Sequence, residues 1–118
     1  MSKITGKAVI RVDGQELRSL DGATLNVGGV TREAKQGSSK IWGYTEKPTA
    51  PEMSCKVAHT ADTDLIALGN ITNATIDFET DTGDRYIIVD GWVVDPPSLD
   101  SSSGDVDLKF SGVECKRA

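Results

Sequence analysis

Residues 74–89, ATIDFETDTGDRYIIV, contain the pattern on which the expected fold depends. Apolar and polar residues alternate from Ala74 to Glu79, which is the period of a strand with one buried face. Residues 81–84, DTGD, favour a turn. The return segment, 85–89, has apolar residues on both faces, as expected for a strand that is covered on both sides. The stretch therefore predicts an antiparallel hairpin at the centre of a β fold.

The two-residue period continues on both sides of this hairpin. It predicts further short strands at 8–12, 15–19, 23–27, 52–59, 92–94 and 106–110. Asp13-Gly14 forms a turn between the first two, and Asp90-Gly91 bends the chain before the strand at 92–94. About seven or eight such strands predict a mainly β protein, an antiparallel β-sandwich or a small barrel.

Two segments depart from the strand pattern. The segment 62–69 is predicted to be a short helix, with Asp62 or Thr63 capping its start and Gly69 closing it. The segment 28–51 contains four glycines and two prolines and is predicted to be one long irregular loop, in which only 40–44 could form a brief strand. Because a domain seldom keeps a loop beyond about 12–15 residues without a role, this loop is the first candidate functional element.

Length and charge limit the function classes. The 118 residues fit a single domain, 1–118. The chain has 13 basic and 18 acidic residues, a net charge of −5 and a pI near 4.7. Affinity for DNA comes mainly from Lys and Arg contacts to phosphates, so this composition disfavours a nucleic-acid-binding protein. An acidic surface that DNA passes without sticking is compatible with it.

The two cysteines, Cys55 and Cys115, are expected to be reduced. Residues 1–14 lack the apolar run of a signal peptide, and no stretch approaches the roughly 20 apolar residues of a membrane helix. We therefore expect synthesis in a bacterial cytoplasm, where disulfides are rare.

Residues that carry catalysis or bind metals form no recognisable pattern. The only histidine, His59, lies at a predicted strand end without a GxSxG motif. Residues 77–83 resemble a calcium loop, but an EF-hand needs Gly at position six and Glu at twelve, whereas Gly83 is seventh and the twelfth residue is not Glu. Cys55, Cys115 and His59 are too few for zinc. We therefore expect no enzyme activity, no cofactor and no metal.

Residues 6–14 (GKAVIRVDG) and 43–51 (GYTEKPTAP) occur in this order before a third set of spaced residues: Thr75, Gly83, Tyr86, Gly91, Trp92, Gly104, Phe110 and Gly112. Together they cover most of the chain, and their pattern resembles the tail tube proteins of Mu-like contractile-tailed phages. The stretch 43–51 is the most specific part. The stretch 37–42, GSSKIW, departs from the family pattern, which leaves the conformation of the loop tip open.

The resemblance implies a structural virion protein of the phage tail. Six copies would form a ring in which their sheets join into one barrel around a channel, and the rings would stack into a tube for genome passage. Implied partners are further copies of the chain and the sheath, tape measure, tail terminator and baseplate hub proteins, with DNA only in transit. Inner tubes of pyocins and type VI secretion systems have the same architecture.

Two sets of candidate site residues follow. The expected subunit interface is the long loop, with Trp42, Gly43, Tyr44, Glu46, Pro48 and Pro51. The candidate channel acids are Asp77 and Glu79 or Asp105 and Asp107, because each pair projects from one strand face. Two alternatives remain: a monomeric β-sandwich joining module of a tail or baseplate, and a small hydrolase, which lacks an identifiable nucleophile with its base.

Overall fold

The hairpin predicted at 74–89 lies at the centre of the main sheet in the computed structural model, which describes residues 3–20 and 22–118. Strand β7 (Ala74–Thr80) pairs antiparallel with β8 (Arg85–Val93), and Thr80 and Asp84 close the turn between them through backbone and hydroxyl hydrogen bonds. The predicted fold class, mainly antiparallel β with one short helix, is confirmed within the described residues.

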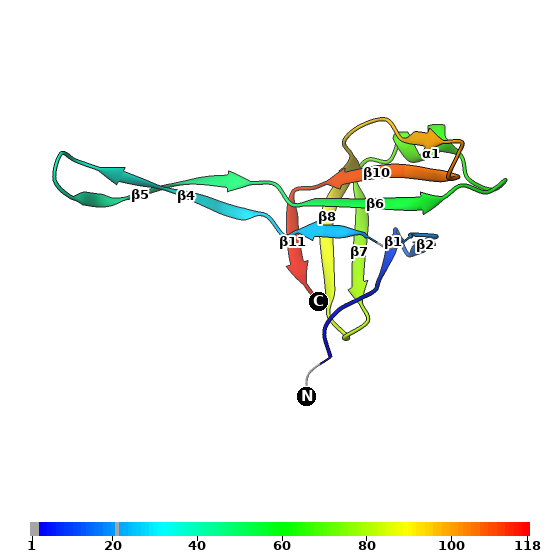
Figure 1. Cartoon of the computed structure of the whole chain (residues 1–118), viewed down its shortest axis with the longest axis horizontal. Coiled ribbons are helices and arrows are strands. Elements are labelled where there is room, and N and C mark those ends of the chain that lie inside the picture. The colour runs from blue at the N-terminus through cyan, green and yellow to red at the C-terminus, as the bar shows by residue number, and fades with distance from the viewer. Residues whose placement is uncertain (1–2, 21) are drawn as a thin grey trace.

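Strand β8 belongs to two layers of strands (Figure 1). The first layer runs β2–β1–β7–β8 and has β11 on the far side of β8. The second layer begins where Trp92 and Val93 of β8 pair with β10, and continues through β6 to β3, with β9 beside β10. The bounds are β1 Ala8–Val12, β2 Gln15–Leu17, β3 Thr24–Asn26, β6 Glu52–Ala58, β9 Ser98–Asp100, β10 Asp105–Ser111 and β11 Glu114–Arg117.

The core lies between these two layers. On β6 and β10, alternate residues are buried and meet as cross-strand partners: Met53 with Phe110, Cys55 with Leu108 and Val57 with Val106. The first layer contributes Ile10, Val12, Ala74, Ile76, Phe78 and Ile88. The alternation that predicted these strands is therefore a direct consequence of one face packing on the core.

Strand β8 changes layer at Asp90 and Gly91. Asp90 has a positive φ of 50°, and the β7–β8 register shifts opposite this point. Gly91 is buried, and a Cβ on it would lie 2.5 Å from Cδ1 of Ile76. The backbone of Gly112 packs against this point, since a Cβ on Gly112 would lie 3.4 Å from Cα of Gly91 and would clash with Cγ2 of Ile88. The predicted bend is thus confirmed, and a side chain at position 91 or 112 would clash where the layers meet.

The predicted helix is shorter than expected. Helix α1 covers Leu65–Gly69, and its N-cap is Asp64, whose Oδ1 accepts hydrogen bonds from the backbone N–H groups of Ile66 and Ala67. The predicted caps were wrong by one or two positions: Thr63 instead accepts a hydrogen bond from the Thr60 N–H group in the preceding turn. No helix in the described part of the chain is long and apolar enough to cross a membrane.

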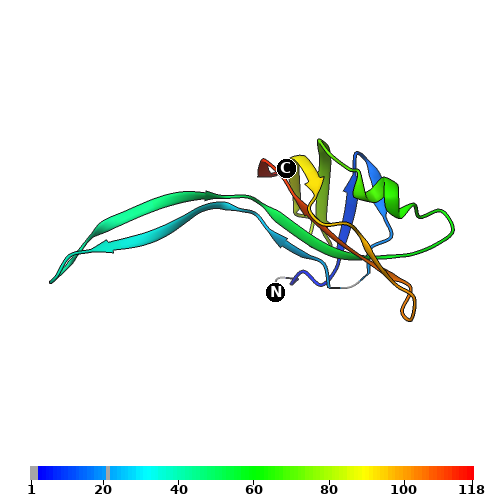
Figure 2. The same cartoon turned by 90° about the horizontal axis from the view of Figure 1, so that it is seen from above.

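The segment predicted as a long irregular loop, 28–51, is instead a two-stranded hairpin. Strands β4 (Gly29–Gln36) and β5 (Ile41–Thr49) pair with each other and with no other strand among the described residues. We call residues 29–49 the arm and the remaining residues the body. The arm projects far from the body (Figures 1 and 2), which spreads the chain over 62 × 40 × 28 Å. The radius of gyration is 17.4 Å, against about 13–14 Å for a compact chain of this length.

The short strands differ from the prediction in their bounds and in their number. The return strand after the first turn ends at Leu17, and β3 covers only Thr24–Asn26. Two short strands were not predicted: β9 at Ser98–Asp100 and β11 at Glu114–Arg117. Both are mostly exposed, so they carry no hydrophobic alternation, and only their pairing with β10 and β8 makes them strands.

Both cysteines are free thiols. Cys55 is buried in the core, and its removal from water raises the pKa of its thiol from 9.0 to about 12. Partial burial also raises the pKa of Cys115. Because only the thiolate reacts with alkylating reagents, both thiols should be protected in the folded chain.

We predict that iodoacetamide at pH 8 leaves Cys55 unmodified in the native protein and labels it completely in denaturant. The higher pKa alone lowers its thiolate fraction by roughly a thousandfold. Mass spectrometry of timed samples measures the labelling. Rapid native labelling of Cys55 would contradict its place in the core.

Candidate subunit interface

Every residue of both arm strands is exposed to solvent. The exposed residues include large apolar ones: Ile41, Trp42 and Tyr44 expose 66%, 69% and 62% of their surface. An isolated two-stranded hairpin is marginally stable in water, because it has no layer to pack against. The arm therefore exposes an apolar surface that no other described residue covers, as expected of a contact surface.

One face of the arm carries three of the predicted interface residues together. The register pairs Ala34 with Tyr44, Arg32 with Glu46 and Val30 with Pro48, and these pairs follow one another on the same face. The Arg32 guanidinium lies 5.8 Å from the centre of the Tyr44 ring and 3.7 Å from Oε1 of Glu46. Cross-strand contacts of this kind hold the two strands in register.

The tip of the arm is built around Trp42. The Lys40 Nζ lies 4.5 Å from the centre of the indole ring, within the range of a cation–π interaction. Gly37 lies beside the same ring, and its N–H donates to the Lys40 carbonyl across the turn. Gly43 follows with a φ of 151°. The tip whose conformation the sequence left open thus presents a cation and an aromatic ring as one unit.

The root of the arm is fixed inside the body. Pro51 is buried, and its carbonyl accepts a hydrogen bond of 2.9 Å from Oγ of the buried Ser111. The structure therefore places Pro51 apart from the other predicted interface residues. Gly28 was missed as a structural residue: it has a φ of 72°, and a Cβ on it would lie 2.6 Å from the Thr49 carbonyl oxygen. The Gly-Gly pair at 28–29 is the sequence signal of this close approach between the two ends of the arm.

We predict that Gly28→Ala destabilises the protein by about 2 kcal/mol, because the new Cβ meets backbone atoms and the left-handed conformation adds strain. Gly29→Ala is the matched control. It also has a positive φ, 117°, but nothing lies within 4 Å of its Cβ position, so it should cost about 1 kcal/mol. Urea denaturation measures both, and an equal loss would contradict the crowded root.

The four candidate channel acids fall into two different environments. On the first layer, Asp77 is buried and its Oδ2 lies 2.6 Å from Nη2 of Arg85, while Oε2 of Glu79 lies 2.6 Å from Nη1 of Arg11. The hydrogen bond that Arg85 donates to Asp77 raises the pKa of Arg85, and the one that Arg11 donates to Glu79 raises the pKa of Arg11. These two acids are therefore neutralised by their own chain.

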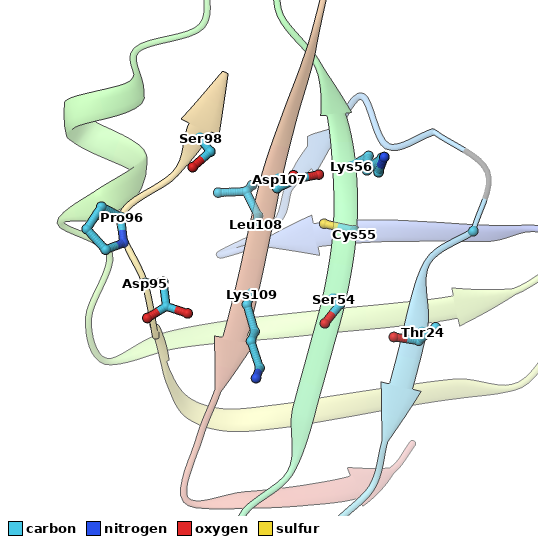
Figure 3. Close-up of a pocket in the computed structure, with 11 residues that line it drawn as sticks. Thr24, Ser54, Cys55, Lys56, Asp95, Pro96, Ser98, Asp107, Leu108 and Lys109 are labelled. Atoms are coloured by element: carbon cyan, nitrogen blue, oxygen red, sulfur yellow. The ribbon is translucent and has the colours of Figure 1, made fainter. Parts of the chain in front are cut away.

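The second pair lies on the outer face of the second layer, away from the core. Asp107 is exposed there as the cross-strand partner of Lys56, and Asp105 is half-buried two residues away. Asp107, Lys109 and Lys56 line a shallow hollow of about 380 Å³ on this face with Ser54 and Thr24 (Figure 3). Among the described residues, neither Asp105 nor Asp107 has a basic nitrogen within 4.0 Å of its carboxylate, so their charges remain available.

We predict that Arg85→Gln lowers the melting temperature by roughly 5–10 °C, because it leaves the buried Asp77 charge without its partner. The Oδ1 atom of Asp77 already lacks a hydrogen-bond partner, so no second donor compensates the loss. Arg11→Gln is the control, since its partner Glu79 is 41% exposed and water replaces the lost contact. Equal shifts in a thermal melt would contradict this difference.

The described residues include no group of three His, Cys, Asp or Glu side chains that could hold a metal ion. What stands out is an exposed arm on a small β-sandwich. The family model for phage tail tube proteins matches residues 1–117, and the chain belongs to that family. It is thus a structural component of the virion tail and not an enzyme, as predicted.

Curated relatives and solved structures agree with this assignment. The chain is 42% identical to the Mu-like prophage FluMu tail tube protein of Haemophilus influenzae, over 98% of this chain and 97% of the relative. It is 34% identical to the tail tube protein of Escherichia phage Mu, over 95% and 92%. The tube terminating cap of the anti-feeding prophage has the same fold, with a TM-score of 0.68, 8% identity and coverage of 98% and 89%. Hcp1 from Flavobacterium johnsoniae also has this fold, with a TM-score of 0.59, 12% sequence identity and coverage of 94% of both chains.

Proposed function

We propose that copies of this chain, each one tail tube domain spanning residues 1–118, form hexameric rings that stack into a tube around a channel for the phage genome. The family assignment supports the tube, and the fold shared with Hcp1 fits a ring-forming subunit. The observation that carries the proposal is the arm. Its exposed strands and aromatic side chains gain stability only when they contact another copy.

The sheet edges support the same assembly. Strand β3 pairs with β6 alone among the described residues, so its other edge is open at the end of the second layer. An open edge is a template for pairing with another chain, and closure of the layer between neighbours removes it. In such a ring the polar outer face of β6 and β10 lines the channel, which makes Asp105 and Asp107 the channel acids.

The arm residues Trp42, Gly43, Tyr44, Glu46 and Pro48 then form the contact between subunits, and Pro51 holds the root of the arm in place. Within a ring the heterologous contact closes after six copies, whereas the contact between stacked rings does not close, so a stack grows until another protein stops it. The sheath, tape measure, tail terminator and baseplate hub proteins are the proposed partners. Synthesis in the host cytoplasm is consistent with two free thiols.

The decisive experiment is electron microscopy with light scattering across a concentration series of the purified protein. We expect rings or hollow tubes. A matched variant replaces residues 32–46 by Asn-Gly, which joins the register partners Thr31 and Lys47 through a favoured two-residue turn. We expect this variant to keep the circular dichroism spectrum of the body but to remain monomeric. Monomeric wild type at every concentration would favour a joining module instead.

We predict that Asp107→Lys in particles with normal tails slows genome release several-fold, because a cationic channel attracts DNA phosphates. Glu114→Lys, on the exposed strand β11 of the other layer, is the control and should leave release unchanged. The time course of DNA release from complemented particles measures both. Equal rates in the two variants would remove β10 from the channel wall.

A further inference from the structure

The β1–β2 hairpin and helix α1 lie at the end of the body away from the arm (Figures 1 and 2). Side chains of these elements and of the end of β6 line a groove. Its volume is about 490 Å³, which is within the range of pockets that hold a ligand or side chains. The apolar lining comes from Val12, Leu17, Val57, Leu68 and Ile71. All five belong to the core or pack against it, so the groove is an opening onto the core.

The charged lining of the groove is mainly acidic. It consists of Asp13, Glu16, Asp62 and Asp64 with one base, Arg18, whose Nη1 donates a hydrogen bond of 2.7 Å to Oγ1 of Thr60. None of the four acids belongs to an ion pair formed by the described residues. Asp64 caps helix α1 and Asp13 accepts a hydrogen bond from the Thr75 N–H group, but no basic side chain neutralises either acid among the described residues. The groove therefore combines an apolar floor with a negative rim.

The arm has the opposite charge. It contains four basic and two acidic residues, although the whole chain has a net charge of −5. The body therefore has nine of the 13 basic residues and 16 of the 18 acidic ones. At the tip, Lys40 forms no ion pair with any described residue and lies over the ring of Trp42, beside the exposed Ile41. The tip thus presents one cation with two large apolar side chains.

We propose that the groove receives the arm tip of a second copy of this chain, with Ile41 and Trp42 on the apolar floor and Lys40 at the acidic rim. This inference rests on the proposed self-assembly and specifies its contact. The arm and the groove lie at opposite ends of the molecule, so the contact is head to tail and can repeat from copy to copy.

Charge reversal tests the contact. Lys40→Glu should raise the concentration needed for assembly about tenfold, and the double variant Glu16→Lys with Asp62→Lys should do the same, because each places like charges together. Combining all three substitutions should restore assembly to within about threefold of wild type. Lys47→Glu is the control: Lys47 lies on the arm face opposite Tyr44, away from the tip, and its reversal should have little effect.

Crosslinking tests the geometry in a Cys115→Ser background. Copies with Ile41→Cys are mixed with tagged copies that contain Asp62→Cys, and a short bis-maleimide is added. The expected product is a crosslinked pair that contains one tagged chain and forms only in the mixture. Tubes without this product, or with unchanged assembly of the charge variants, would overturn the groove contact while leaving self-assembly intact. Wild type that never assembles would overturn both.

Discussion

The structure depends on the close approach of two backbones where strand β8 leaves the first layer and enters the second. Gly91 and Gly112 meet there, and the side chains of Ile76 and Ile88 fill the space that a Cβ would need. Because β8 pairs with β7 on one side of this point and with β10 on the other, the two layers close on a common core. Burial of apolar surface is the dominant favourable term in folding, and the core is buried only when this crossing brings the two layers together.

The sequence predicted those parts of the fold in which burial alternates. The strands at 8–12, 52–58, 74–80 and 105–111 each bury one face, and the pattern of their apolar residues was sufficient to find them. The arm could not be found in this way. Its strands bury neither face, so hydrophobicity has no period there, and the glycines and prolines gave the only signal. The length of the arm was predicted, whereas its pairing was not.

The candidate site shows the same limit at the level of single residues. Asp77 and Asp107 occupy equivalent positions in two alternating strands, and nothing in their local sequence separates them. Their environments differ because Arg85 lies beside Asp77, eight residues along the chain, whereas Asp107 faces solvent on the other layer. Spacing also placed Pro51 with the interface residues, although the hydrogen bond from Ser111, 60 residues away, anchors it in the body. Such long-range partners are set by topology and not by pattern.

Because the arm lies at one end of the molecule, the two ends of the chain present different surfaces. In a head-to-tail stack, one terminal layer displays free arms with exposed aromatic rings, and the opposite layer displays body surface that no arm covers. The two ends of such a stack would therefore be chemically different, with an apolar, basic end and an acidic one. A protein that starts the stack and a protein that stops it would then recognise unlike surfaces, so neither could replace the other.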